Sequence, residues 1–271
     1  MELDDTQRIV LAAQYRKFID GCHVLHYHGV LDAYGHLSFR HPFDPQVFVM
    51  SKFIAPGTIS SPDDLIEYHV SNAEPLDPSS VKGYSERHIH SELYKRHAHV
   101  QAVIHSHAES VIPYTISNVP LRPCYHMAGF LGLGEGGCPA VYDAADYFKE
   151  DDIPDMLVRN SHLGEALATC FDRGSVVTLM RGHGLTVIGG GIEEVVSRAM
   201  YTMKNASIQT AALTMQTAFA AQSGQGKQAG LKFLNDNESE ASADMLKWSA
   251  QRPWKLWVRE VEACGLYLNS A

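Results

Sequence analysis

The chain of 271 residues is acidic, with 22 Lys and Arg residues against 31 Asp and Glu residues and a formal net charge of −9. Hydrophobic residues make up 45% of it, which is ordinary for a globular protein with a sizeable core. An acidic chain without a basic run excludes a nucleic-acid partner, whose phosphates need a concentrated basic face. We see no apolar stretch of membrane-spanning length and no signal-peptide pattern, so we expect a cytoplasmic protein without a membrane partner.

The first half of the chain predicts a helix, two paired strands, a second helix and a strand. Apolar residues at helical spacing predict the first helix, which ends near Gly21 or continues towards residue 29. Alternating apolar residues predict the strands, and Ser85 is a suitable N-cap for the second helix. The predicted elements are, in order, a helix within 4–30, strands at 35–40 and 47–50, a helix at 86–97 and a strand at 100–105.

The second half begins with an irregular Gly- and Pro-rich segment and becomes helical towards its end. The elements predicted there are a helix at 160–171, strands at 175–180 and 185–188, a long helix at 192–222, a linker at 223–241 and a last helix at 242–264, with Pro253 as a candidate break in it. We therefore expect an α/β domain over 1–222, followed by a linker and C-terminal helical extension over 223–271. The alternation of helices with strands would by itself favour a parallel sheet.

Three histidines carry the clearest chemical signal. His105 and His107 follow the apolar pair Val103 and Ile104, and His183 lies far downstream in a Gly-His-Gly turn. In an extended strand, residues i and i+2 point to the same face, so the first two imidazoles can meet at one point. Three imidazole ligands that leave one position open are typical of a catalytic zinc or a neighbouring divalent metal. This arrangement favours an enzyme.

An ordered set of motifs resembles the class II aldolase/adducin family over roughly residues 5–220. The matching segments are Gly35-His36-Leu37-Ser38-Phe39-Arg40, Tyr84-Ser85-Glu86, His105-Ser106-His107 and His183-Gly184. Glu86 lies 19 residues before the first histidine ligand, which is the family's separation. With the segment His126-Met127-Ala128-Gly129, the pattern is most similar to the branch that holds pyridine-dicarboxylate decarboxylase and the prenylated hydroxyphenylpyruvate oxygenase of aminocoumarin biosynthesis.

The resemblance implies a class II aldolase-like three-layer α/β fold, in which helices cover a central, mostly antiparallel sheet. The antiparallel sheet implied by the resemblance therefore replaces the parallel sheet that alternation alone would favour. It also implies a homotetramer with active sites at subunit interfaces and one divalent metal per subunit. His105, His107 and His183 would hold the metal, with Zn the first choice and Mn, Co or Fe as alternatives.

The same resemblance suggests three catalytic residues. Glu86 would be the acid or base, or a fourth metal ligand. Taken alone, it would be a first-turn helix glutamate stabilised by the helix dipole. His126 would donate a proton, and Tyr84 would stack on an aromatic substrate or form a hydrogen bond to it. For both histidines outside the ligand set, His36 and His126, an ordinary loop position is the alternative.

Five further residues are candidates for binding the substrate. Arg40 and Arg181 could each grip a carboxylate through a bidentate fork, and structural ion pairs are the alternative. His36, Ser38 and Ser85 would line the pocket beside them.

The expected substrate is a small carboxylate without a phosphate. The family's sugar-phosphate aldolases bind phosphate with a Gly-Asn loop and a Ser-Ser pair, which here read Gly35-His36 and Tyr84-Ser85. Phosphate sites need several N–H groups, hydroxyls or arginines, and this set is incomplete. We expect a metal-dependent carbon–carbon lyase that decarboxylates, or cleaves by retro-aldol chemistry, an aromatic hydroxy- or oxo-acid through an enolate-like anion. The alternatives are an iron oxygenase and a sugar-phosphate aldolase or epimerase. A non-catalytic, adducin-like scaffold is the least favoured alternative, because this chain keeps the three histidines and Glu86.

Overall fold

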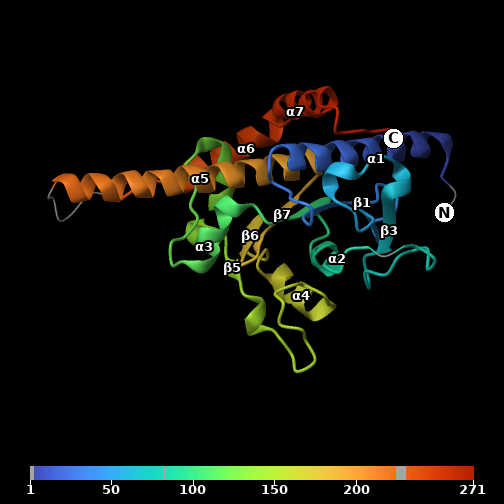
Figure 1. The fold of residues 1–271 in the computed structure, drawn as a ribbon, viewed down its shortest axis with the longest axis horizontal. Coiled ribbons are helices and arrows are strands. Elements are labelled where there is room, and N and C mark those ends of the chain that lie inside the picture. The colour runs from blue at the N-terminus through green and yellow to red at the C-terminus, as the bar shows by residue number, and fades with distance from the viewer. Residues whose placement is uncertain (1–2, 82, 224–229) are drawn as a thin grey trace.

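A seven-stranded sheet in the order β3-β2-β1-β4-β7-β6-β5 forms the centre of the computed structural model, which describes residues 3–81, 83–223 and 230–271 (Figure 1). The strands are β1 (His36–Arg40), β2 (Val47–Ser51), β3 (Leu65–His69), β4 (Ala102–Ser106), β5 (Val141–Tyr142), β6 (Val177–Met180) and β7 (Gly184–Gly189). Within this sheet every neighbouring pair is antiparallel except β5 and β6. The mostly antiparallel sheet is confirmed, and the parallel sheet suggested by simple alternation is wrong.

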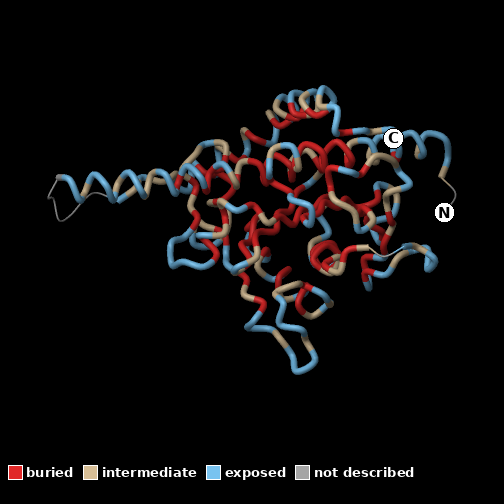
Figure 2. Tube along the Cα trace, viewed as in Figure 1, coloured by how far each residue is buried: buried red, intermediate tan, exposed pale blue. Residues whose placement is uncertain are grey.

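Helices cover both faces of the sheet, which gives three layers (Figure 1). Helices α1 (Asp5–Tyr27) and α5 (Ile192–Ser223) lie on one face, and α2 (Arg87–Arg96) and α4 (Ser161–Thr169) lie on the other. The central strands are therefore buried along their whole length, as the tube in Figure 2 shows. Because side chains alternate along a strand, Ile104 packs towards α1 and α5 whereas its neighbour Val103 packs towards α2 and α4.

Helix α1 does not end at Gly21 but continues to Tyr27. A Cβ atom on Gly21 would lie 3.1 Å from the side chain of Leu37 in β1 and 3.2 Å from that of Ile192 in α5. The glycine thus permits close packing of α1 against the sheet and α5, and it is not a stop signal.

The C-terminal segment forms α6 (Asp236–Ser249) and α7 (Gln251–Ala263). The first begins earlier than predicted because Asn235 and Glu238 form a capping box, so the polar run assigned to the linker is already helical. Residues 224–229 of that predicted linker lie outside the described residues. The helices part at Ala250, just before Pro253, which lies in the first turn of α7 where its missing N–H needs no helical partner.

The C-terminal segment packs on the main body. Trp254, Trp257 and Val261 of α7 are buried in the core layer beside α1, and the hydroxyl of Tyr267 lies 2.8 Å from His26 Nδ1. The division of the chain at residue 222 stays a prediction. Among the described helices, none combines the length and the hydropathy needed to cross a membrane.

The remaining short elements lie in the connections between these strands and helices. They are α3 (Ile112–Ile116) and the 3₁₀ turns η1 (Pro56–Thr58), η2 (Pro62–Asp64), η3 (Glu109–Val111), η4 (His126–Gly132), η5 (Glu135–Gly137) and η6 (Ala144–Asp146).

Candidate metal centre and active site

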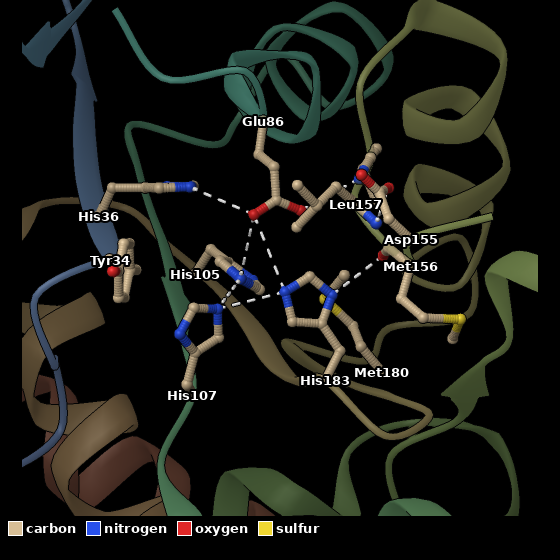
Figure 3. A network of polar contacts seen from close by, with 12 residues as sticks. Tyr34, His36, Glu86, His105, His107, Asp155, Met156, Leu157, Met180 and His183 are labelled. Carbon is tan, nitrogen blue, oxygen red and sulfur yellow. Dashed lines mark hydrogen bonds and ion pairs between the residues drawn. The ribbon is translucent and has the colours of Figure 1, made fainter. Parts of the chain in front are cut away.

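The three predicted histidine ligands meet at one end of the sheet (Figure 3). His105 lies in β4, His107 directly follows that strand, and His183 lies in the turn that connects β6 to the adjacent β7. The Nε2 atom of His107 is 3.0 Å from Nε2 of His105 and 3.2 Å from Nε2 of His183. Antiparallel pairing of β4 with β7 therefore brings together histidines that are far apart in the sequence.

Glu86 completes this cluster from the start of α2. Its Oε2 atom lies 3.6 Å from Nε2 of His105 and 3.8 Å from Nε2 of His183 (Figure 3). Its other oxygen, Oε1, accepts a hydrogen bond of 3.0 Å from the backbone N–H of Val158. One potential ligand atom from each of the four residues lies within 4.8 Å of the others.

The chemistry and orientation of these four groups fit a divalent metal. Nitrogen lone pairs that face one another at about 3 Å repel unless a cation or a proton lies between them, and three imidazoles with a carboxylate form a common zinc-type ligand set. His107 Nδ1 donates to Asp32 Oδ2 at 3.0 Å, and His183 Nδ1 donates to the carbonyl of Met156 at 3.1 Å. These outer contacts leave both Nε2 atoms unprotonated and aimed at the centre.

Burial sets the protonation of the cluster. It holds the pKa of His105 well below its ordinary range, and it lowers the pKa of His183 despite the opposing charge of Glu86. Both rings are therefore neutral, which is the form that binds a metal. Burial also raises the pKa of Glu86, although His183 and the Val158 N–H favour its charged form.

A cavity of about 500 Å³ opens onto the cluster. Its walls include Glu86, His107 and His183 together with three aromatic residues, Ser85 and Arg159; the aromatic residues are Tyr34, Phe53 and Tyr84. A second cavity, of about 650 Å³, reaches His107 from the side of Asp32, Tyr125 and Lys204. Only the first of these two cavities also contacts Glu86 and His183, so it is the better candidate for the reacting part of a substrate.

Four of the predicted site residues lie in or directly behind this cavity. Tyr84 and Ser85 line it. His36 is buried behind it, with its ring centroid 4.7 Å from that of Tyr84 and its Nε2 atom 3.9 Å from Glu86 Oε2. Ser38 lies one step deeper, and its Oγ atom is within 2.7 Å of both His90 Nδ1 and the Tyr94 hydroxyl.

Three other residues predicted for the site lie away from the cluster in the described part of one chain. They are Arg40, Arg181 and His126. Arg40 is buried at the far end of β1 and donates to the carbonyls of Val100, Pro45 and Tyr94, so its guanidinium is occupied by the backbone. Arg181 is paired with Asp143, as the structural alternative anticipated. His126 is exposed at the start of η4 and contacts the ring of Tyr125.

Sequence reasoning missed Asp32, Arg159 and His90. Asp32 lies 75 residues from its partner His107, and Arg159 lies in an irregular segment, so no spacing indicates either residue. His90 does carry a signal, since it follows Glu86 by one helical turn and therefore falls on the same face of α2.

Comparison with known proteins identifies the family of this chain. The family described as the class II aldolase and adducin N-terminal domain matches residues 16–210, and the chain belongs to this family. The decarboxylase tropJ of Talaromyces stipitatus is 51% identical over 94% of this chain and 97% of its own length. The 3,4-dihydroxyphthalate decarboxylase of Arthrobacter keyseri is 30% identical over 67% of this chain and 66% of its own length.

A solved structure supports the fold. The L-fuculose 1-phosphate aldolase from Glaciozyma antarctica PI12 superposes with a TM-score of 0.69 over 97% of this chain and 93% of its own, at 16% identity. The family resemblance and the fold class expected from the sequence are thus confirmed, and the chain is a lyase.

Proposed function

We propose that this protein is a divalent-metal-dependent decarboxylase of a small, unphosphorylated aromatic hydroxy-carboxylic acid. The observation that carries the proposal is the position of the His105, His107, His183 and Glu86 cluster at the wall of a cavity lined by aromatic rings and Arg159. The named decarboxylases among the relatives support the reaction type, and one of them acts on a dihydroxylated aromatic dicarboxylate.

The aromatic side chains favour a flat substrate. Tyr34, Phe53 and Tyr84 offer ring faces and edges around a space large enough for a single substituted ring. Arg159 adds a positive charge at the same wall, and its planar guanidinium suits a carboxylate. The guanidinium of Arg159 also pairs with Asp155, and a substrate carboxylate would share or replace that partner. In this proposal Arg159 would take the role that the sequence suggested for Arg40 or Arg181.

A phosphate group has poor support at this site. Ser60 and Ser61 form a pair of adjacent hydroxyl residues that could be considered for binding a phosphate. Both donate their backbone N–H groups to the carboxylate of Asp64, at 2.8 and 3.1 Å. These donors are therefore satisfied within the loop by a negatively charged side chain and are not available to a phosphate.

Glu86 is suited to deliver the proton that decarboxylation requires. The bond between the ring carbon and the carboxylate breaks, carbon dioxide leaves, and the electron pair stays on the ring carbon. The Oε2 atom of Glu86 faces the cluster and the cavity, where it could carry a proton and transfer it to that carbon. A divalent metal held by the three histidines would supply positive charge that stabilises a substrate oxygen beside the breaking bond.

We further propose zinc as the metal and a homotetramer as the assembly. Three imidazole ligands with one position left open suit zinc, although manganese, cobalt and iron accept similar ligands. The C-terminal part of α5 projects from the body and exposes the apolar side chains of Met215 and Phe219, which would be covered in an oligomer (Figures 1 and 2).

The test is product analysis with zinc-loaded protein. 3,4-Dihydroxyphthalate serves as the substrate, phthalate as the matched acid without hydroxyls, and L-fuculose 1-phosphate as an aldolase probe. We expect carbon dioxide release equal to substrate loss, without uptake of dioxygen and without turnover of the sugar phosphate. Dioxygen consumption that matches product would instead indicate an oxygenase, and aldehyde release from the sugar phosphate an aldolase.

A further inference from the structure

A chain of four buried polar side chains runs from the interior to the back of the cluster. The Tyr94 hydroxyl lies 2.7 Å from Ser38 Oγ, Ser38 Oγ lies 2.6 Å from His90 Nδ1, and His90 Nε2 lies 2.7 Å from His36 Nδ1. All four residues are at most 2% exposed. His36 Nε2, at the end of the chain, points at Glu86 in Figure 3.

Only one direction of hydrogen-bond donation gives both hydroxyls along this row of four side chains an acceptor. Within the described residues, Ser38 Oγ is the hydrogen-bond partner of the Tyr94 hydroxyl, so Tyr94 donates to Ser38. Ser38 must then donate its own hydrogen to His90 Nδ1. His90 therefore carries its proton on Nε2 and donates it to His36 Nδ1, which leaves the proton of His36 on Nε2.

The opposite direction fails for a physical reason. If His90 were protonated on Nδ1, it would donate to Ser38, and the hydrogen of either Ser38 or Tyr94 would find no acceptor among the described residues. A buried hydroxyl without an acceptor is unfavourable. Burial also keeps the pKa of His90 well below its ordinary range, so the ring is neutral and has one proton to place.

The proton on His36 Nε2 has no protein acceptor at bonding distance. The nearest oxygen, Glu86 Oε2, is 3.9 Å away, which is too far for a hydrogen bond, and within the described residues this buried atom has no other partner. A buried donor aimed at the reacting region and left without a partner indicates a position for a ligand oxygen.

We propose that Ser38 and His90 are positioning residues that hold His36 as the Nε2–H tautomer, so that His36 presents a neutral hydrogen-bond donor to a substrate oxygen beside Glu86. This inference rests on the proposed function and deepens it, since it selects substrates with a hydroxyl, oxo or carboxylate oxygen next to the carbon that is protonated. His36 makes the direct contact, whereas Ser38 and His90 act through it.

The tautomer can be read directly by NMR. In protein with ¹⁵N-labelled histidine, two-bond ¹H–¹⁵N correlations distinguish a protonated ring nitrogen from an unprotonated one, and His36→Gln assigns the signals. We expect His36 to be protonated on Nε2 and unprotonated on Nδ1, both in metal-free protein and after zinc is added. Protonation on Nδ1, or loss of the Nε2 proton when zinc binds, would overturn the assignment.

Two serine variants test the positioning role. Ser38→Ala removes the donor to His90, and we expect both tautomers of His36 to appear. Ser91→Ala is the matched control, because Ser91 is an equally buried serine beside His90 whose hydroxyl contacts the helix carbonyl of His88 instead. An unchanged His36 signal in Ser38→Ala, or an equal change in Ser91→Ala, would contradict the role.

Turnover then tests the contact with substrate. His36→Ala should lower kcat/KM for the hydroxylated acid about tenfold, as expected for a lost hydrogen bond, and His36→Gln should restore part of it. An unchanged kcat/KM in a folded, zinc-binding His36→Ala protein would exclude the donor role. Because the NMR readout needs no turnover, it decides the tautomer even if the protein proves not to be a decarboxylase.

Discussion

The two carboxylate oxygens of Glu86 have different environments. Oε1 is held by the Val158 N–H, whereas Oε2 faces the histidine cluster and the cavity. The first contact fixes the side chain, and the second atom is free to exchange a proton with a substrate. A glutamate in the first turn of a helix is common, so the residue type alone does not indicate a catalytic role for Glu86. In the sequence, only the order of the surrounding motifs indicates that role.

Glu86→Gln should therefore remove the proton donor with little change in shape. We expect kcat to fall about 100- to 10,000-fold while the metal stays bound to the three histidines. Steady-state kinetics together with metal analysis would check this. Glu92→Gln is the control, since Glu92 is a buried glutamate of the same helix that pairs with Lys95. A near-normal kcat in metal-loaded Glu86→Gln would rule out the assigned role.

Asp32 accepts a hydrogen bond from His107 Nδ1 and would orient this proposed metal ligand. Replacing it with Asn weakens the acceptor for His107 Nδ1–H, so the affinity for zinc should fall about 10- to 100-fold. Competition with a chromogenic chelator measures the change. Asp77→Asn, in an exposed loop where the carboxylate accepts from Ser79, should leave the affinity unaltered. Equal affinities for Asp32→Asn and wild type would be inconsistent with this role.

Arg159 is the guanidinium at the cavity wall. Arg159→Ala should lower kcat/KM about 10- to 100-fold, mainly through KM, because a charged hydrogen bond to the substrate carboxylate is lost. Arg173→Ala is the matched control, since Arg173 is also an exposed arginine paired with a carboxylate, that of Glu135. If the KM of Arg159→Ala is no higher than that of Arg173→Ala, the substrate carboxylate is bound elsewhere.

At the scale of elements, the site depends on the contact between the start of β7 and the end of β4. Ser106↔Leu185 and His105↔Thr186 are paired there, and Gly184 sits where any Cβ atom would overlap the carbonyl oxygen of Ser106. The glycine thus lets the His183 turn approach the His105 strand closely enough for their imidazoles to meet.

Gly184→Ala should separate these two strands. We expect the free energy of unfolding to fall by about 1–3 kcal/mol and zinc affinity to fall with it, because the backbone must shift to make room. Urea unfolding and zinc titration measure the two effects. Gly191→Ala, whose Cβ would meet nothing closer than 3.9 Å, is the control. Unchanged stability and affinity in Gly184→Ala would show that the approach is not needed.

At the scale of the whole molecule, the sequence predicted the elements better than their arrangement. Apolar spacing and caps are local, so α2, α4, α5 and most strands were anticipated. Strand order is not local, and only the family resemblance pointed to the antiparallel sheet. For the same reason the histidine cluster could be predicted from ordered motifs, whereas Asp32 and Arg159 required the structure. Arg40 was misleading because burial among backbone carbonyls leaves no trace in spacing.

The cavity and the histidine cluster are built from residues between positions 34 and 183. The proposed decarboxylation needs a metal held by His105, His107 and His183. The most direct measurement is carbon dioxide release from 3,4-dihydroxyphthalate by one protein sample as purified, after chelation, and after zinc is returned. We predict no release by the metal-free protein, full recovery at about one equivalent of zinc per chain, and no recovery in His107→Ala. An undiminished rate in metal-free protein would contradict the account.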